Sequence, residues 1–312
     1  MTVRYLCVLL MVAWHPPATS QTCCTGGAPY LGALKLPVVN KSEIGINLSY
    51  NINQNSMLVL KDKIIHETEN YRLVQAVFFQ SDVGINDNLS VSFILPYLFQ
   101  TEQVGLGDNT STIRNNSIGD ILVGSNYKFK SGHHSFNFGF AIKAPTGKNN
   151  SVDTKTNIPY PLSFQNGTGS WDVLFNLFDE ISFEHLDNVY WINQLSARLN
   201  SKGNDFEAHP GYKFGNSFSY YSAVSLRWIA GNHPAAGFLG FTYQYIAQDQ
   251  FDGGYANSNT GGNWIYTSFS YNHQFSPRFN IGLSLSVPIY RSVYGLQLTT
   301  RWQANTTLSY TI

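Results

Sequence analysis

Charge is scarce in this chain of 312 residues, because Asp, Glu, Lys and Arg together make up only 12% of it, against roughly a quarter of an average soluble protein. The 19 basic and 19 acidic residues also cancel. Zero net charge gives nucleic acid no electrostatic footprint, so we expect no nucleic-acid partner. A surface with so few charges is unusual for a protein that water surrounds.

Cysteine and long apolar runs are rare as well. Cys7 lies in an apolar N-terminal segment, which leaves only the adjacent pair Cys23 and Cys24, so disulfides do not hold this fold. Two neighbouring thiolates supply half of a tetrahedral metal site, and we expect neither a metal nor a cofactor. After residue 20 no apolar run approaches the ~18 residues of a spanning helix, which excludes a helical membrane protein.

Strict alternation is the pattern that the chain does contain. The stretch SFNFGFAIK alternates large apolar residues (Phe136, Phe138, Phe140) with small or polar ones (Asn137, Gly139), and a period of two predicts a β-strand. About twelve such segments recur, an even number, and the large residues always share one face. We therefore predict an all-β fold, namely a transmembrane antiparallel up-and-down β-barrel of about twelve strands.

The low charge content decides which face of these strands meets the surroundings. A soluble barrel shows its polar face to water, and 12% charged residues are too few to cover such an exterior. The large apolar face is then expected to meet lipid, with the polar face lining a lumen. Since every backbone group needs a partner inside a membrane, the sheet must close.

The connections between the strands alternate in length, as they do in outer-membrane barrels. Short connections are expected at residues 83–88, 130–135, 184–188, 230–237 and 273–277. Long ones, rich in Asn, Gly, Ser and Thr, are expected at residues 51–70, 100–117, 144–169, 200–216 and 247–261.

Three regions are expected along the chain. Residues 1–20 contain Arg4, an apolar run and small residues before Gln21, which is typical of a signal peptide. Residues 21–42 are expected to be a tail, either in the periplasm or plugging the barrel, and residues 43–312 the transmembrane barrel. The last strand, ending at Ile312, resembles the terminal strand that the outer-membrane assembly machinery recognises, although Phe is usual at the last position.

Charged residues on the polar face are the candidate lumen-lining residues. They have mixed signs, so they either brace the wall as ion pairs or give weak selectivity between anions and cations. By strand phase they are Glu43, Asp120, Lys128, Asp172, Glu180, Arg198, Arg227 and Arg301.

No pattern points to catalysis. The histidines after the signal, among them His133 and His134, fall in connections or at the last residue of a strand, and none stands mid-strand beside a Ser. The stretch APTGKNN lacks the first Gly and the Ser or Thr of a phosphate-binding loop. We expect the protein not to be an enzyme.

Four pieces of the sequence carry a resemblance to a known family. They are SIGDILVGSNYKF (117–129), KAPTGK (143–148), NGTGSWDV (166–173) and LSVPIYR (285–291). In this order they resemble the outer-membrane barrels grouped under the MetA pathway of phenol degradation, a family described as transporters. The resemblance implies a place in the outer membrane of a Gram-negative bacterium, lipid around the barrel, and small-molecule solutes as cargo.

The leading functional hypothesis is a channel for passive passage of small organic molecules, hydrophobic ones included. In this hypothesis the polar wall is the path and the long outer connections, especially residues 144–169, are the filter. The alternative is a closed barrel that acts as a surface-binding or structural protein through its long loops. A soluble all-β binding protein is the third hypothesis.

Overall fold

The computed structural model describes residues 40–106, 109–154, 156–203 and 210–312. Strands form nearly all of the regular structure, with two short 3-10 helices, η2 (Leu162–Phe164) and η3 (Asp252–Gly254), in the connections. The expected signal peptide and residues 21–39 of the expected tail, with Cys23 and Cys24, lie outside the described residues. Within the described ranges no helix is long and apolar enough to cross a membrane.

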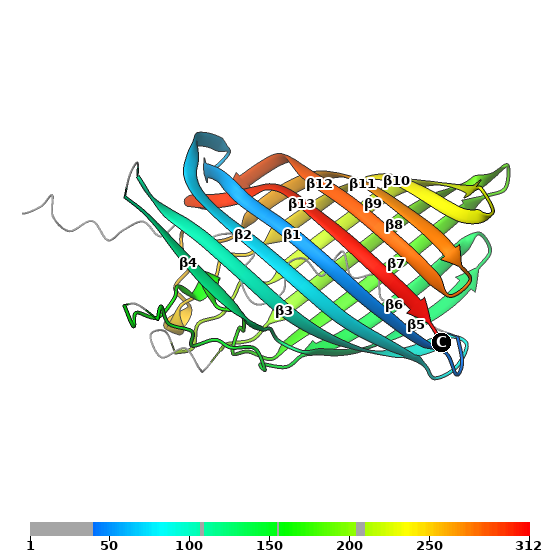
Figure 1. Cartoon of the computed structure of the whole chain (residues 1–312), viewed down its shortest axis with the longest axis horizontal. Coiled ribbons are helices and arrows are strands. Elements are labelled where there is room, and N and C mark those ends of the chain that lie inside the picture. Colours follow the sequence, from blue (N-terminus) through cyan, green and yellow to red (C-terminus); the bar gives the residue numbers. More distant parts are fainter. Residues whose placement is uncertain (1–39, 107–108, 155, 204–209) are drawn as a thin grey trace, which may run out of the picture.

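The strands wind into one closed barrel (Figure 1). Strand β13 pairs with β1 from Thr311 opposite Gly45 to Leu296 opposite Leu60, which closes the sheet. Both β4 and β5 pair with β3, so the thirteen described strands occupy twelve positions in the wall. This architecture confirms the predicted antiparallel barrel. The strands are β1 (Ile44–Leu60), β2 (Lys63–Gly84), β3 (Leu89–Leu106), β4 (Asn109–Ile118), β5 (Leu122–Ser131), β6 (His134–Lys143), β7 (Asp172–Phe183), β8 (Leu186–Asn200), β9 (Ser217–Ala230), β10 (His233–Ile246), β11 (Gly262–Ser276), β12 (Phe279–Val293) and β13 (Leu296–Thr311).

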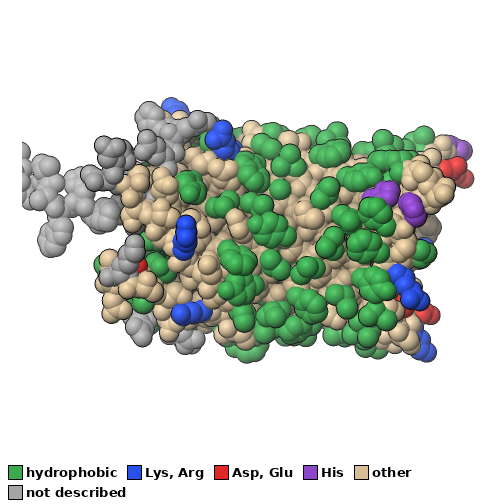
Figure 2. Space-filling model, viewed as in Figure 1, with side chains coloured by type: hydrophobic (Ala, Val, Ile, Leu, Met, Phe, Trp, Pro, Cys, Tyr) green, Lys and Arg blue, Asp and Glu red, His purple; other side chains and the backbone are tan. Residues whose placement is uncertain are grey.

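A broad apolar belt lies across the face of the barrel shown in Figure 2, and exposed large apolar residues occur on strands on every side of the barrel. On β6, Phe138 and Ile142 are 47% and 42% exposed, whereas Ala141 between them is buried. Leu239 and Phe241 on β10 are exposed in the same way. Because a closed sheet satisfies its own backbone groups, such a belt is suited to hydrocarbon. On β6, Phe138 and Ile142 face outward as predicted.

The two ends of the barrel differ in their connections. One end, here called the turn end, carries the short turns and the last residue, Ile312; the other, here called the loop end, carries the connections 144–171, 201–216 and 247–261. At the turn end, Gly132 has φ of +56°, a left-handed conformation that glycine adopts at little steric cost in a tight turn.

Two of the five expected long connections are wrong. Strand β1 continues to Leu60 and β2 begins at Lys63, so residues 51–70 form a hairpin instead of a loop. Likewise β3 continues to Leu106 and β4 begins at Asn109, within the expected loop 100–117. The polar residues in both segments indicated a loop. They form strands because side-chain contacts and burial outweigh the low intrinsic preference of Asn and Ser for the strand conformation.

The wall is interrupted between β4 and β5, at residues 119–121. Among the described strands β4 pairs only with β3, so one edge of it has no neighbouring strand. The connection 144–171 covers this edge instead: the Lys148 N–H donates to Ile118 O (3.4 Å), Tyr160 Oη to Arg114 O (3.1 Å) and Asn166 Nδ2 to Asn115 O (3.4 Å). An uncovered edge inside a membrane would leave backbone groups unpaired, so this connection completes the wall.

The inner face is apolar on one side and polar on the other. Strand β1 turns Asn47, Ser49 and Asn51 inward, as expected for a polar lumen. The expectation that the whole inner face is polar is wrong, because β2 and β3 carry large apolar residues on both faces and the alternation rule cannot separate them. The inward apolar cluster consists of Ala76, Phe78, Ile94, Leu98, Leu122, Ala141 and Leu174.

Candidate functional site

Four charged side chains meet where the wall is interrupted, and we call them the ion cluster: Asp120, Lys143, Asp172 and Arg198. Lys143 Nζ lies 2.6 Å from Asp120 Oδ2 and 2.9 Å from Asp172 Oδ2. Arg198 Nη2 lies 2.8 Å from the same Asp172 oxygen. The side chains of Asp120, Lys143 and Asp172 are fully buried, so each charge depends on the others for its solvation.

The ion cluster anchors both ends of the connection 144–171. Near its start, the Gly147 N–H donates to Asp120 Oδ1 (2.8 Å), and near its end the Thr168 N–H donates to Asp120 Oδ2 (2.9 Å). Thr168 Oγ1 also bonds to Lys143 Nζ. The two arms touch, because a Cβ on Gly167 would stand 2.2 Å from the carbonyl oxygen of Gly147. Only glycine allows this approach.

The middle of the same connection enters the loop end of the barrel. Helix η2 is buried, and backbone and side-chain groups in and next to it accept hydrogen bonds from strands β2, β3 and β4. Asn115 Nδ2 donates to Phe164 O (2.6 Å), and Gln100 Nε2 donates to Asn166 Oδ1 (2.7 Å). Arg72, paired with Glu102 at 2.8 Å, donates to Ser163 O (3.2 Å). The connection therefore narrows the lumen at the loop end.

The three long connections pack on one another above this constriction. Leu162, Tyr212 and Phe214 form an apolar cluster with Phe251 against it, which joins residues from all three. We call the described residues of these three connections together the loop lid.

Asp249 ties two of the connections in the loop lid together. Tyr212 Oη donates to Asp249 Oδ2 (2.7 Å), and the Gly215 N–H donates to Asp249 Oδ1 (2.7 Å). Burial raises the pKa of Asp249 from 3.8 to about 6, although these hydrogen bonds oppose the shift. Burial and the neighbouring carboxylate also raise the pKa of Tyr212, so this tyrosine stays a donor. The stability of the loop lid thus depends on pH in the range between 3.8 and about 6.

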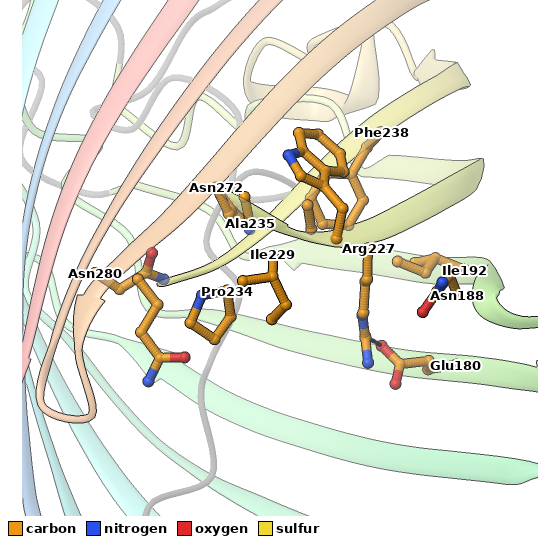
Figure 3. Close-up of a pocket in the computed structure, with 13 residues that line it drawn as sticks. Glu180, Asn188, Ile192, Arg227, Ile229, Pro234, Ala235, Phe238, Asn272 and Asn280 are labelled. Atoms are coloured by element: carbon orange, nitrogen blue, oxygen red, sulfur yellow. Dashed lines mark hydrogen bonds and ion pairs between the residues drawn. The ribbon is translucent and has the colours of Figure 1, made fainter. Parts of the chain in front are cut away.

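A pocket of about 650 Å³ opens into the barrel at the turn end (Figure 3). Residues from β7 to β12 line it, and its charged members are Glu180 and Arg227, whose Oε2 and Nη2 atoms lie 2.5 Å apart. This volume is within the range of small-molecule sites, whereas no nucleophile with an adjacent base lines it. In the described part of the chain no group of three His, Cys, Asp or Glu side chains could hold a metal ion.

The structure brings most of the expected lumen charges together as ion pairs. Asp120, Asp172 and Arg198 belong to the ion cluster, and Glu180 pairs with Arg227. Whether these residues line a path for solutes stays a prediction.

Three of the expected lumen charges lie apart from these pairs. Glu43 lies in the turn before β1, where its carboxylate accepts from Asn40 Nδ2 (3.0 Å). Lys128 is half-buried on β5. Arg301 is exposed on β13, at the register shift where Gln54 faces Trp302 and Asn55 faces Thr300. Their lumen-lining role also stays a prediction.

Sequence reasoning missed Lys143, Asp82 and Asp249. Lys143 continues the inward phase of Gly139 and Ala141 and ends its strand, so the alternation could have found it. Asp82, fully buried at the turn end, accepts from Asn47 Nδ2 and Gln80 Nε2 at 3.0 Å, and its strand phase was equally readable. Nothing in the sequence signals Asp249, because its partners come from another connection.

The comparisons with known proteins agree with this geometry. The model of a family described as "Putative MetA-pathway of phenol degradation" matches residues 51–303. The chain belongs to this family. The protein is thus an outer-membrane β-barrel of the phenol-degradation family, and the resemblance read from the four sequence pieces is confirmed. The comparison with curated proteins gives no match.

Two of the solved structures that match the barrel have a TM-score of 0.50 or more. The COG4313 outer membrane channel from Pseudomonas putida F1 matches with a TM-score of 0.69 and 13% identity, over 96% of this chain and 100% of that one. The β domain of the Bordetella autotransporter BrkA matches with a TM-score of 0.50 and 10% identity, over 86% of this chain and 99% of that one. At these identities the likeness shows a shared fold.

Residues of the ion cluster and residues that donate to it come from three of the four pieces that carry the family resemblance. Asp120 comes from SIGD, Lys143 and Gly147 from KAPTGK, and Thr168 and Asp172 from NGTGSWD. The sequence pieces that resemble the family thus supply the residues that anchor the connection 144–171.

Proposed function

We propose that this protein is an outer-membrane channel through which small organic molecules, hydrophobic ones included, pass passively. The observation that carries the proposal is the inner face, which is apolar on β2, β3 and β5–β7 and polar on β1, and which ends in a pocket of about 650 Å³ at the turn end. A wall of mixed character suits molecules that have both an apolar body and a polar group.

The connections of the loop end fit the role of a filter. Helix η2 narrows the lumen from the loop end, and the ion cluster holds its connection in place. The similarity to a protein named an outer membrane channel supports passage, and the phenol-degradation description of the family supports small organic cargo.

The charged residues are proposed to divide into two roles. Asp120, Asp172 and Arg198 brace the wall, because they are buried and paired. Glu180 and Arg227 border the path, because the pair is partly exposed, with 24% and 40% of the side chains accessible.

The same proposal extends to how the barrel reaches its membrane. Strand β13 alternates up to Thr311, and this supports insertion by the outer-membrane assembly machinery. The proposed role is passage and not catalysis.

The packing of the loop lid favours a second candidate, a closed barrel that binds partners at the cell surface.

Swelling of lipid vesicles separates the two candidates. Vesicles that contain the folded protein and an impermeant osmolyte inside are placed in isotonic solutions of small uncharged solutes. A channel predicts swelling that slows as solutes become larger, whereas a rate equal to that of protein-free vesicles for every solute would refute the channel.

A further inference from the structure

The pocket at the turn end has two chemically different sides. The polar side consists of Glu180, Asn188, Arg227, Asn272, Gln274 and Asn280. The apolar side includes Ile192, Ile229, Pro234 and Phe238. Ile229 is 67% exposed although its strand phase turns it inward, so a large apolar surface is available inside the barrel.

The charged pair of the pocket is held in a defined orientation. Arg227 Nη2 lies 2.5 Å from Glu180 Oε2, and the guanidinium carbon lies 3.7 Å from the ring centroid of Tyr190. Stacking on a ring restrains the guanidinium plane. Both side chains stay partly exposed, so the pair has surface left for a ligand.

The balance of charge selects the kind of ligand. A carboxylate that approaches Arg227 also meets the negative Glu180, and an ammonium group that approaches Glu180 meets the positive Arg227. A hydroxyl or carbonyl group suffers neither repulsion and can bond to the pair. The carboxamides of Asn188 and Asn280 also line the pocket and add uncharged donors and acceptors.

The apolar residues stand where the body of such a ligand would lie. In Figure 3, Ile229 and Pro234 lie between the Glu180–Arg227 pair and Asn280. A ligand that reaches the pair with a polar group would therefore place its remaining atoms on these two side chains. Burying apolar atoms there is favourable because it removes them from water.

We propose that this pocket binds a small uncharged amphipathic molecule, with a hydroxyl or carbonyl group on Arg227 and Glu180 and an apolar body against Ile229 and Pro234. The inference rests on the proposed channel function and deepens it, because it names the class of solute that pauses in the lumen.

Benzyl alcohol and benzoate test this inference because they share a ring and differ in charge. Binding of each to the folded full-length protein in detergent is measured by saturation-transfer NMR. The native protein is expected to bind benzyl alcohol about tenfold more tightly than benzoate. Arg227→Gln is expected to weaken benzyl alcohol binding about tenfold, because the charged donor is lost.

Glu180→Gln provides a test that loss of folding cannot imitate. Without the carboxylate, the charge of Arg227 is unpaired, and the order of affinities should reverse in favour of benzoate. Asp179→Asn is the matched control: Asp179 precedes Glu180 on the opposite face of β7, pairs with His134 at 3.0 Å, and should leave both affinities unchanged. Partition of the two ligands into detergent micelles is the same for the native protein and the three variants, so it cannot change the order of affinities.

Two results would overturn the inference: no binding of benzyl alcohol to the native protein, or equal preferences in the native, Arg227→Gln and Glu180→Gln proteins. Binding in detergent does not require passage, so this outcome is independent of vesicle swelling. Swelling without binding would refute the pocket and leave the channel standing. Binding without swelling would refute the channel and leave the pocket standing.

Discussion

Replacement of Lys143 by Met should destabilise the connection 144–171, because it removes the cation that two buried carboxylates share. Removing one partner of a buried ion pair costs about 3–5 kcal/mol. Asp172 keeps Arg198 at 2.8 Å, and Asp120 keeps hydrogen bonds from Gly147 and Thr168. We therefore expect the lower end of this range, about 3 kcal/mol.

The free energy of unfolding in urea and the rate of proteolysis within the connection measure this effect. Lys143→Met should lower the first and raise the second, and adding Asp120→Asn should restore part of both, since the unpaired charge is gone. Lys202→Met is the matched control, because Lys202 pairs with Asp252 at 3.4 Å and both side chains are more than half exposed. Its cost should stay below about 1 kcal/mol. Equal costs for Lys143→Met and Lys202→Met would refute the anchoring role of the ion cluster.

Three further changes have defined outcomes. Since burial raises the pKa of Asp249 from an unfolded value of 3.8 to about 6, burial of this carboxyl group costs least below pH 3.8, where it is neutral, and the cost rises by about 3 kcal/mol in all as pH increases through 6. The loop lid should then resist protease better at about pH 5 than at about pH 8, and Asp249→Asn should abolish the difference; a native protein with no such difference contradicts this account. Gly167→Ala should cost about 2 kcal/mol in urea unfolding, because the new Cβ meets Gly147 O at 2.2 Å, and an unchanged midpoint would argue against the close contact. Phe138→Arg, on the lipid face, should cost about 2–4 kcal/mol when unfolding is measured in lipid vesicles, and a cost near zero would place this residue away from hydrocarbon.

Alternation in the sequence predicted the fold well where the two faces of a strand differ. It assigned Phe138 and Ile142 to the lipid face because Gly139 and Ala141 stand between them. It failed on β2, where Phe78 points inward and Phe79 outward, because large residues occupy both faces.

The hairpins at the loop end show another limit of composition. Asn53 and Asn55 indicated a loop, yet both pair with β13 and β2 and are buried. The turn that ends this hairpin uses Lys61 at φ of +58°, a residue that gives no turn signal.

The ion pairs were only half predictable from the sequence. Strand phase identified Asp172 and Arg198 as inward, but pairing depends on which strands are neighbours and on the interruption beside Asp120. The entry of residues 162–166 into the barrel had no sequence signal, because its backbone carbonyl groups accept hydrogen bonds from Gln100 and Asn115, which are far away in the chain.

Single-channel conductance in a planar lipid bilayer tests the central claim, that a path for solutes runs through this barrel. The folded protein is compared with a variant in which a short Gly-Ser segment replaces residues 157–166, which include η2. An open path should give discrete current steps for the native protein and larger steps for the variant, because the variant lacks the constriction at the loop end. An absence of steps from both proteins, with folding verified, would contradict the claim of an open path.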